Sequence, residues 1–113
     1  MTIRTIQDLA VSRHRGAATG ITFTLASPAA TLFLGHITIT PDATQATTVG
    51  AIRGGNEAEP GSVELRAPQA AFDGLLALAS QPQTVKLVVS LTYDEATMLV
   101  SSILCRLAVA KAS

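Results

Sequence analysis

Few residues of this chain are of the types that carry chemistry, and only two of them are spaced so that they could act together. These are His36 and Asp42, which lie six positions apart with Pro41 between them. A histidine general base needs a carboxylate that orients its ring, and Asp42 is the nearest acid downstream. Alternation places His36 on the same strand face as Leu32 and Leu34, so we expect it to be partly buried. The pair defines one hypothesis, a small hydrolase or isomerase, with no known motif behind it.

The other reactive residue types show no arrangement typical of catalysis or metal binding. The two histidines are distant and the chain has one cysteine, so the usual spacings of metal ligands do not occur. We therefore predict neither a metal nor a cofactor. Cys105 lies in an apolar segment and is interpreted as a buried structural thiol. Gly54 and Gly55 lack the pattern of a phosphate-binding loop, and Glu57 and Glu59 would repel phosphate.

The charged residues form one basic and one acidic group. The basic group is the consecutive run Arg13, His14 and Arg15. The acidic group lies in and after the glycine loop and comprises Glu57, Glu59 and Glu64. Complementary patches can steer and orient association. One hypothesis is that the basic group meets the acidic group of a neighbouring subunit or of a partner, and the alternative is that both are solvated surface.

Length and composition limit the class of protein. The chain has 113 residues, the size of one domain, and we assign residues 1–113 to a single domain. Eight basic and eight acidic residues give a net charge of zero, so neither nucleic acid nor an anionic membrane is expected as a partner. A lone cysteine cannot form an intrachain disulfide, and no apolar run has the length of a signal peptide or membrane span. We expect a soluble, cytoplasmic protein.

Hydrophobic alternation with a period of two predicts β-strands along most of the chain. The clearest case is Thr84–Tyr93, where Val85, Leu87, Val89 and Leu91 share one parity. Further strands are expected over residues 20–27, 31–41, 47–53 and 62–66. The first fifteen residues fit a short helix and a strand equally well.

One helix is predicted over residues 68–81. Proline suits a first helical turn, and an apolar stripe follows at positions i, i+3, i+4 and i+7. The stripe consists of Phe72, Leu75, Leu76 and Ala79. Pro82 ends the helix, because the residue before a proline is disfavoured in the α region.

The segment 97–109 allows two structures. Its β-branched residues favour a strand, whereas Asp94 could cap a helix over residues 95–110. The fold prediction is therefore an antiparallel β-sandwich or open barrel of about six to seven strands with one packed helix. The alternative is an α+β fold with a second helix at the C-terminal end.

The best indication of function is a surplus of apolar surface rather than any polar residue. Only 14% of the residues are charged, and the segment from Met98 on is apolar on both parities. We therefore predict a non-enzymatic module that self-associates or binds another protein through apolar sheet surface. The expected interface comprises Arg13, His14, Arg15, Tyr93, Met98, Val100 and Leu104. An alternative is a small β-barrel that holds an apolar ligand in a cavity lined by Leu32, Leu34, Leu87 and Val89.

Overall fold

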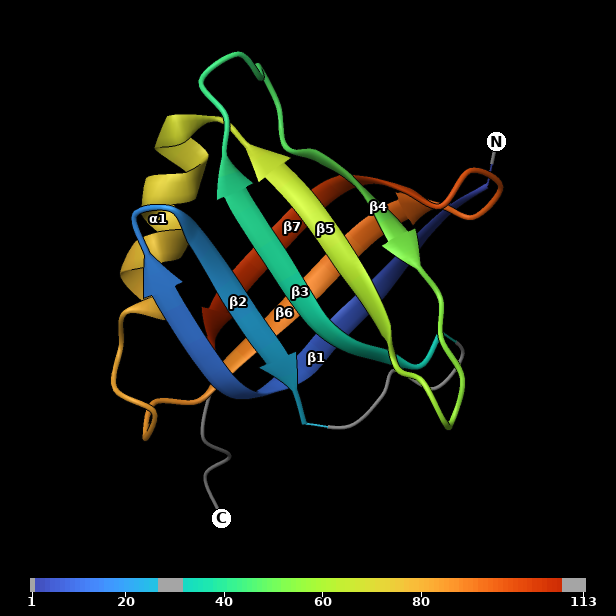
Figure 1. The fold of residues 1–113 in the computed structure, drawn as a ribbon, viewed down its shortest axis with the longest axis horizontal. Helices are drawn as coiled ribbons and strands as arrows, with labels where there is room; N and C mark the ends of the chain where they lie inside the picture. The colour runs from blue at the N-terminus through green and yellow to red at the C-terminus, as the bar shows by residue number, and fades with distance from the viewer. Residues whose placement is uncertain (1, 27–31, 109–113) are drawn as a thin grey trace.

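The computed structural model describes residues 2–26 and 32–108, which form seven strands and one helix (Figure 1). The elements in chain order are β1 (Ile3–Ala17), β2 (Gly20–Leu25), β3 (Leu34–Pro41), β4 (Val49–Arg53), β5 (Gly61–Ala67), α1 (Gln69–Ala79), β6 (Leu87–Asp94) and β7 (Leu99–Leu107). Neighbouring strands pair in the order β1-β2-β3-β5-β4-β7-β6, and β6 pairs with β1 to close a barrel. The predicted barrel of six to seven strands with one packed helix is confirmed.

Strand β1 belongs to both walls of this barrel. In Figure 1 its first half lies beside β6 at the back, and its second half lies beside β2 at the front. The pairing with β6 shifts between Ile6 and Leu9, where Asp8 has a φ of 55°, and the pairing with β2 shifts between Val11 and Arg13. Such irregularities bend a strand and interrupt its alternation. This is why the first fifteen residues, of which Ile3 onward belong to β1 and residue 1 lies outside the described residues, could not be distinguished from a helix by their pattern.

One strand pair departs from the antiparallel arrangement predicted from the sequence. Strands β3 and β5 are parallel, whereas the other strand pairs of the barrel are antiparallel. Parallel neighbours need a crossover connection. Here the crossover contains β4, which pairs with the far side of β5.

The interior of the barrel is filled by aliphatic side chains from alternate strand positions. The fully buried set includes Ile21, Phe23, Leu34, Ile37, Ile39, Val63, Leu65, Leu87, Val89 and Leu91. Three of these come from β6, so the alternation predicted over residues 84–93 is confirmed for the part that forms the strand. The buried hydrophobic residues form one cluster, and His14 is the one buried polar side chain among the described residues.

Strand β3 corrects the prediction that His36 is partly buried. Leu34, Ile37 and Ile39 are all buried, although Leu34 has the opposite parity to the two isoleucines, and His36 is exposed. The pairing with β5 shifts between Leu34 and His36, so the faces change over at Gly35. A shift by one residue moves every following side chain to the other face.

Helix α1 closes one end of the barrel, beside the turn between β1 and β2 (Figure 1). Its buried residues are Phe72 and Ala79, and Leu75 and Leu76 pack against the core. A Cβ atom at Gly16 would lie 2.7 Å from Cδ1 of Leu76, so the absence of a side chain there lets the helix approach β1. The predicted helix and its apolar stripe are confirmed.

The segment after Asp94 is a turn followed by strand β7, so the helix considered for residues 95–110 is wrong; residues 109 and 110 lie outside the described residues. A turn over residues 95–98 connects β6 to β7. The Met98 N–H donates to the Asp94 carbonyl at 2.7 Å, and Met98 has a left-handed φ of 59°. Asp94 caps this turn rather than a helix, since its Oδ1 accepts the Ala96 N–H at 2.9 Å.

Candidate functional site

His36 and Asp42 lie at opposite ends of β3 and share no site. Six residues of extended strand span roughly 20 Å. His36 is exposed between Thr24 of β2 and Ser62 of β5. Asp42 is therefore too far from His36 to orient its ring.

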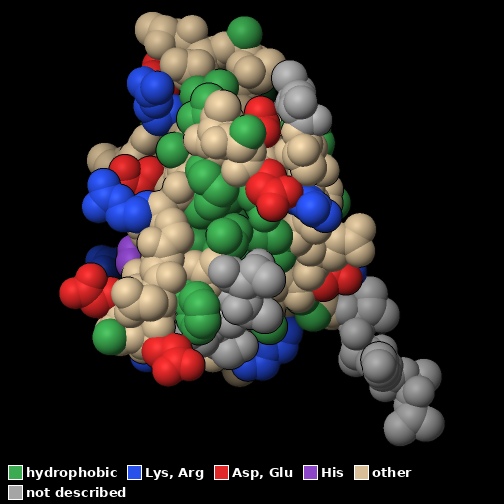
Figure 2. Space-filling view, turned by 90° about the vertical axis from the view of Figure 1, so that its right-hand side faces the viewer, with side chains coloured by type: hydrophobic (Ala, Val, Ile, Leu, Met, Phe, Trp, Pro, Cys, Tyr) green, Lys and Arg blue, Asp and Glu red, His purple; other side chains and the backbone are tan. Residues whose placement is uncertain are grey.

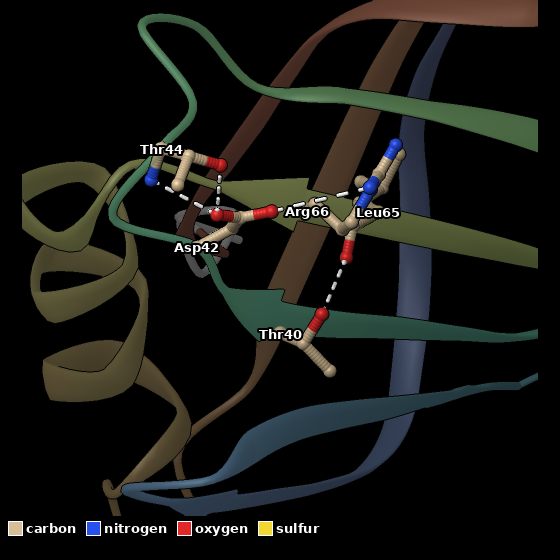
Figure 3. A network of polar contacts seen from close by, with 5 residues as sticks. All are labelled: Thr40, Asp42, Thr44, Leu65 and Arg66. Atoms are coloured by element: carbon tan, nitrogen blue, oxygen red, sulfur yellow. Dashed lines mark hydrogen bonds and ion pairs between the residues drawn. The ribbon is translucent and has the colours of Figure 1, made fainter.

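The Asp42 carboxylate has its own partners, as Figure 3 shows. Its Oδ1 accepts hydrogen bonds from the backbone N–H, at 2.9 Å, and from the hydroxyl of Thr44. Its Oδ2 lies 3.9 Å from Nη1 of Arg66. The Thr44 hydroxyl, followed by the Thr44 N–H, lowers the pKa of Asp42 below its ordinary value. Asp42 therefore orders the loop after β3.

The run Arg13–Arg15 does not form one basic cluster on the surface. Arg13 and Arg15 are exposed, whereas His14 is only 3% exposed. The Nε2 atom of His14 lies 2.8 Å from the carbonyl oxygen of Gln81, and the backbone of His14 exchanges two hydrogen bonds with the Gln83 side chain. His14 thus fixes the connection between α1 and β6 and is not available to an interface.

The apolar residues expected at an interface have different environments. Tyr93 and Val100 are buried in the core at 6% and 3% exposure, and Met98 is half-buried. Leu104 is 59% exposed. Two further exposed leucines of β7, Leu99 and Leu107, were not among the residues expected at the interface. The signal for them was the apolar character of both parities after Met98.

Strand β7 has one edge that is only partly paired. It pairs with β6 along its length, but with β4 only through Gly50–Val100 and Ala51–Leu99. The Ala108 N–H donates to the Lys86 carbonyl of the β6 side at 2.8 Å. Backbone groups of successive residues point to opposite edges of a strand. The N–H and C=O groups of Ile103, Cys105 and Leu107 therefore point away from β6, where none of the described strands pairs with them.

An uncharged groove of about 260 Å³ lies between this edge and α1. It is lined by Thr48, Ala70, Ala71, Gly74, Leu75, Leu78, Ile103, Leu104 and Cys105. Burial raises the pKa of the Cys105 thiol to about 11. A thiol with such a pKa is protonated and unreactive at neutral pH, in agreement with the structural role predicted for it.

A larger pocket, of about 500 Å³, lies at the end of the barrel away from α1. Figure 2 views this end and shows hydrophobic side chains gathered in its middle, with charged side chains around them. The apolar lining comes from Ile6, Leu32, Tyr93 and Met98. At the rim, Nε of Arg4 donates to Oε2 of Glu95 at 2.7 Å. This hydrogen bond is the main reason that the pKa of Arg4 is raised above its ordinary value.

Residues 2–26 and 32–108 contain no cluster of three or more His, Cys, Asp or Glu side chains that could hold a metal ion. No helix in the same part of the chain is long and apolar enough to cross a membrane. Comparison with protein-family models, curated proteins and solved structures finds no match for this chain.

Proposed function

We propose that this protein is a non-enzymatic assembly module that associates with further copies of itself through β7. The observation that supports this most directly is the combination of exposed leucines with a partly unpaired strand edge. Leu99, Leu104 and Leu107 are each at least half exposed, at 54%, 59% and 50%. An exposed hydrophobic strand edge is a template for pairing with another chain.

The edge of β7 lacks two of the residue types that usually prevent such pairing, although α1 lies across a groove from residues 103–105. Native edge strands carry lysines, prolines or inward-pointing charges that block a second strand. Strand β7 has neither lysine nor proline, and its one charged residue, Arg106, is engaged with Asp8 at 2.6 Å. The edge is thus compatible with a partner strand.

A second copy is the partner that fits this edge best. Two copies of β7 placed antiparallel about a two-fold axis present the same free N–H and C=O groups to each other, as an isologous contact requires. Leu104 of each copy would then be covered. The net charge of zero adds no long-range repulsion between identical subunits.

Light scattering coupled to size exclusion tests the proposal over a micromolar concentration series. We expect the wild type to have the mass of a dimer or larger assembly. Leu104→Lys places a charge beside the edge and should shift the mass toward the monomer. Thr24→Lys is the matched control, because Thr24 is exposed on β2, away from β7.

A second variant separates strand pairing from simple apolar contact. Leu107→Pro removes an N–H that points to the free edge and leaves the ladder to β6 intact, so it should also weaken association. A wild type that stays monomeric throughout the series contradicts self-association. If the protein is a monomer that forms a defined complex with another protein through Leu104, the proposed self-association is replaced by binding to a different protein.

The two alternative functions have less support from the geometry. His36 and Asp42 are separated by the length of β3. Leu34, Leu87 and Val89, which were expected to line a ligand cavity, are packed in the core at 0–1% exposure. Leu32 alone of that set lines a pocket, the one at the barrel end away from α1.

A further inference from the structure

The two ends of the barrel are closed in different ways. At one end α1 inserts Phe72, which is fully buried. At the other end the described residues place no helix, and the pocket of about 500 Å³ remains between β1, β6, Leu32 and the turn before β7. Small-molecule sites are typically concave, largely apolar and roughly 300–1,000 Å³ in volume. The pocket meets these conditions.

The backbone around this pocket is strained at two positions. Phe33, next to the lining residue Leu32, has a φ of 52°, and the lining residue Met98 has a φ of 59°. Bulky side chains rarely adopt a left-handed backbone. Both residues are held by hydrogen bonds: the Phe33 carbonyl accepts the Gly61 N–H at 2.7 Å, and the Met98 carbonyl accepts the Ile52 N–H at 2.8 Å. Strain that is held in this way concentrates at ligand sites.

Arg4 is the one cation among the described residues that line the pocket, and only part of its guanidinium is hydrogen-bonded to them. Arg4 donates through Nε to Glu95, and no other hydrogen bond of its guanidinium occurs among the described residues. A guanidinium has five N–H donors, and its terminal Nη groups form a planar fork that matches a carboxylate. Glu95 therefore orients Arg4, whose side chain is 61% exposed, and no described residue accepts from its Nη groups at the rim.

We propose that this pocket binds a small amphipathic carboxylate, with its carboxylate at the Nη groups of Arg4 and its aliphatic part against Ile6, Leu32 and Met98. The Nη groups of Arg4 can form an ion pair with the acid, whereas a neutral head group would form none and a cationic one would face the same guanidinium. The apolar lining selects the aliphatic part, which leaves water on binding. The site is separate from the exposed leucines of β7, so it goes beyond the proposed assembly function and does not depend on it.

Titration with three probes of equal chain length tests this assignment on the full chain. The probes are octanoate, 1-octanol and octylamine, followed by amide chemical shifts in nuclear magnetic resonance. We expect octanoate to shift the amides of Ile6, Leu32 and Met98 and to bind up to about fivefold more tightly than octanol, the range of an exposed ion pair. Octylamine should bind no more tightly than octanol, because the Glu95 carboxylate is already paired with Arg4.

Variants at the rim separate the ion pair from the apolar contact. Arg4→Gln should abolish the preference for octanoate over octanol and leave octanol binding unchanged. Glu95→Gln removes a competing carboxylate and should strengthen octanoate binding. Arg13→Gln, at an exposed arginine of the same strand outside the pocket, is the control and should change neither affinity.

Two results would overturn the assignment. One is an octanoate response centred on residues outside the pocket, such as the groove beside α1. The other is a preference for octanoate that persists in Arg4→Gln. Light scattering of the same samples distinguishes the two proposals. Absence of octanoate binding in an assembled protein refutes only the carboxylate site, and a monomer that binds octanoate refutes only self-association.

Discussion

His14 and Cys105 are both buried, and they accommodate burial in different ways. The ring of His14 has a backbone carbonyl at hydrogen-bonding distance, so its polar atom is satisfied inside the protein. Cys105 has no such partner among the described residues, and desolvation by burial raises the pKa of its thiol to about 11. Ionising the Cys105 thiol is therefore less favourable in the folded state than in the unfolded chain.

This difference gives the stability a dependence on alkaline pH. The pKa of the thiol is about 11 in the folded state and near its ordinary 9.0 in the unfolded chain. Between these values the unfolded state releases the proton and the folded state keeps it, so rising pH favours unfolding. We expect the wild type to lose stability relative to Cys105→Ala from about pH 9 to pH 11, with no relative change below pH 9. Urea unfolding across this range measures it, and parallel curves for the two proteins would contradict it.

Single residues show where sequence patterns stop being informative. Alternation predicted the burial of Val89 and Leu91 correctly, because β6 is regular there. It assigned His36 to the wrong face, because a one-residue shift in pairing leaves no mark in hydrophobicity. The pocket at the barrel end was not predicted, since Arg4, Leu32 and Glu95 meet only through closure of the barrel.

At the scale of elements, α1 contains two residues whose substitution should have opposite effects. Phe72 is fully buried, so Phe72→Ala should destabilise the protein by about 3–5 kcal/mol. Gly74 is exposed, and a Cβ atom there would meet nothing within 4 Å. Gly74→Ala should therefore stabilise the helix by up to about 1 kcal/mol. Thermal unfolding followed by circular dichroism measures both, and an unchanged melting temperature in Phe72→Ala would contradict the packing of α1 on the core.

Elements with a regular pattern were predictable, and those with irregularities were not. Strand β2 and helix α1 carry uninterrupted periods of two and 3.6, and both were predicted within a few residues. Strand β1 carries two pairing shifts, which made its pattern ambiguous. The pairing order, including the parallel pair β3–β5, depends on contacts between distant segments that no local period records.

At the scale of the whole molecule, closure of the barrel joins the two ends of the sequence. Ile3 of β1 pairs with Asp94 of β6. Folds dominated by such non-local pairs form slowly, because the chain loses the entropy of closing the loop before the stabilising contacts form. We expect refolding in milliseconds to seconds, measured by stopped-flow fluorescence of Tyr93, the sole tyrosine in a chain without tryptophan. Complete refolding within tens of microseconds would contradict this.

The seam between β4 and β7 consists of two residue pairs, Gly50–Val100 and Ala51–Leu99, extended by the hydrogen bond from the Ile52 N–H to the Met98 carbonyl. Thermal fluctuations release the least-bonded units of a protein first. Parting this seam leaves every other strand pair intact and turns the closed cylinder into a curved open sheet. Each opening of the seam would expose backbone beside Val100. The lifetime of the closed form is therefore set by a few hydrogen bonds, whereas the free energy of unfolding is set by the whole core.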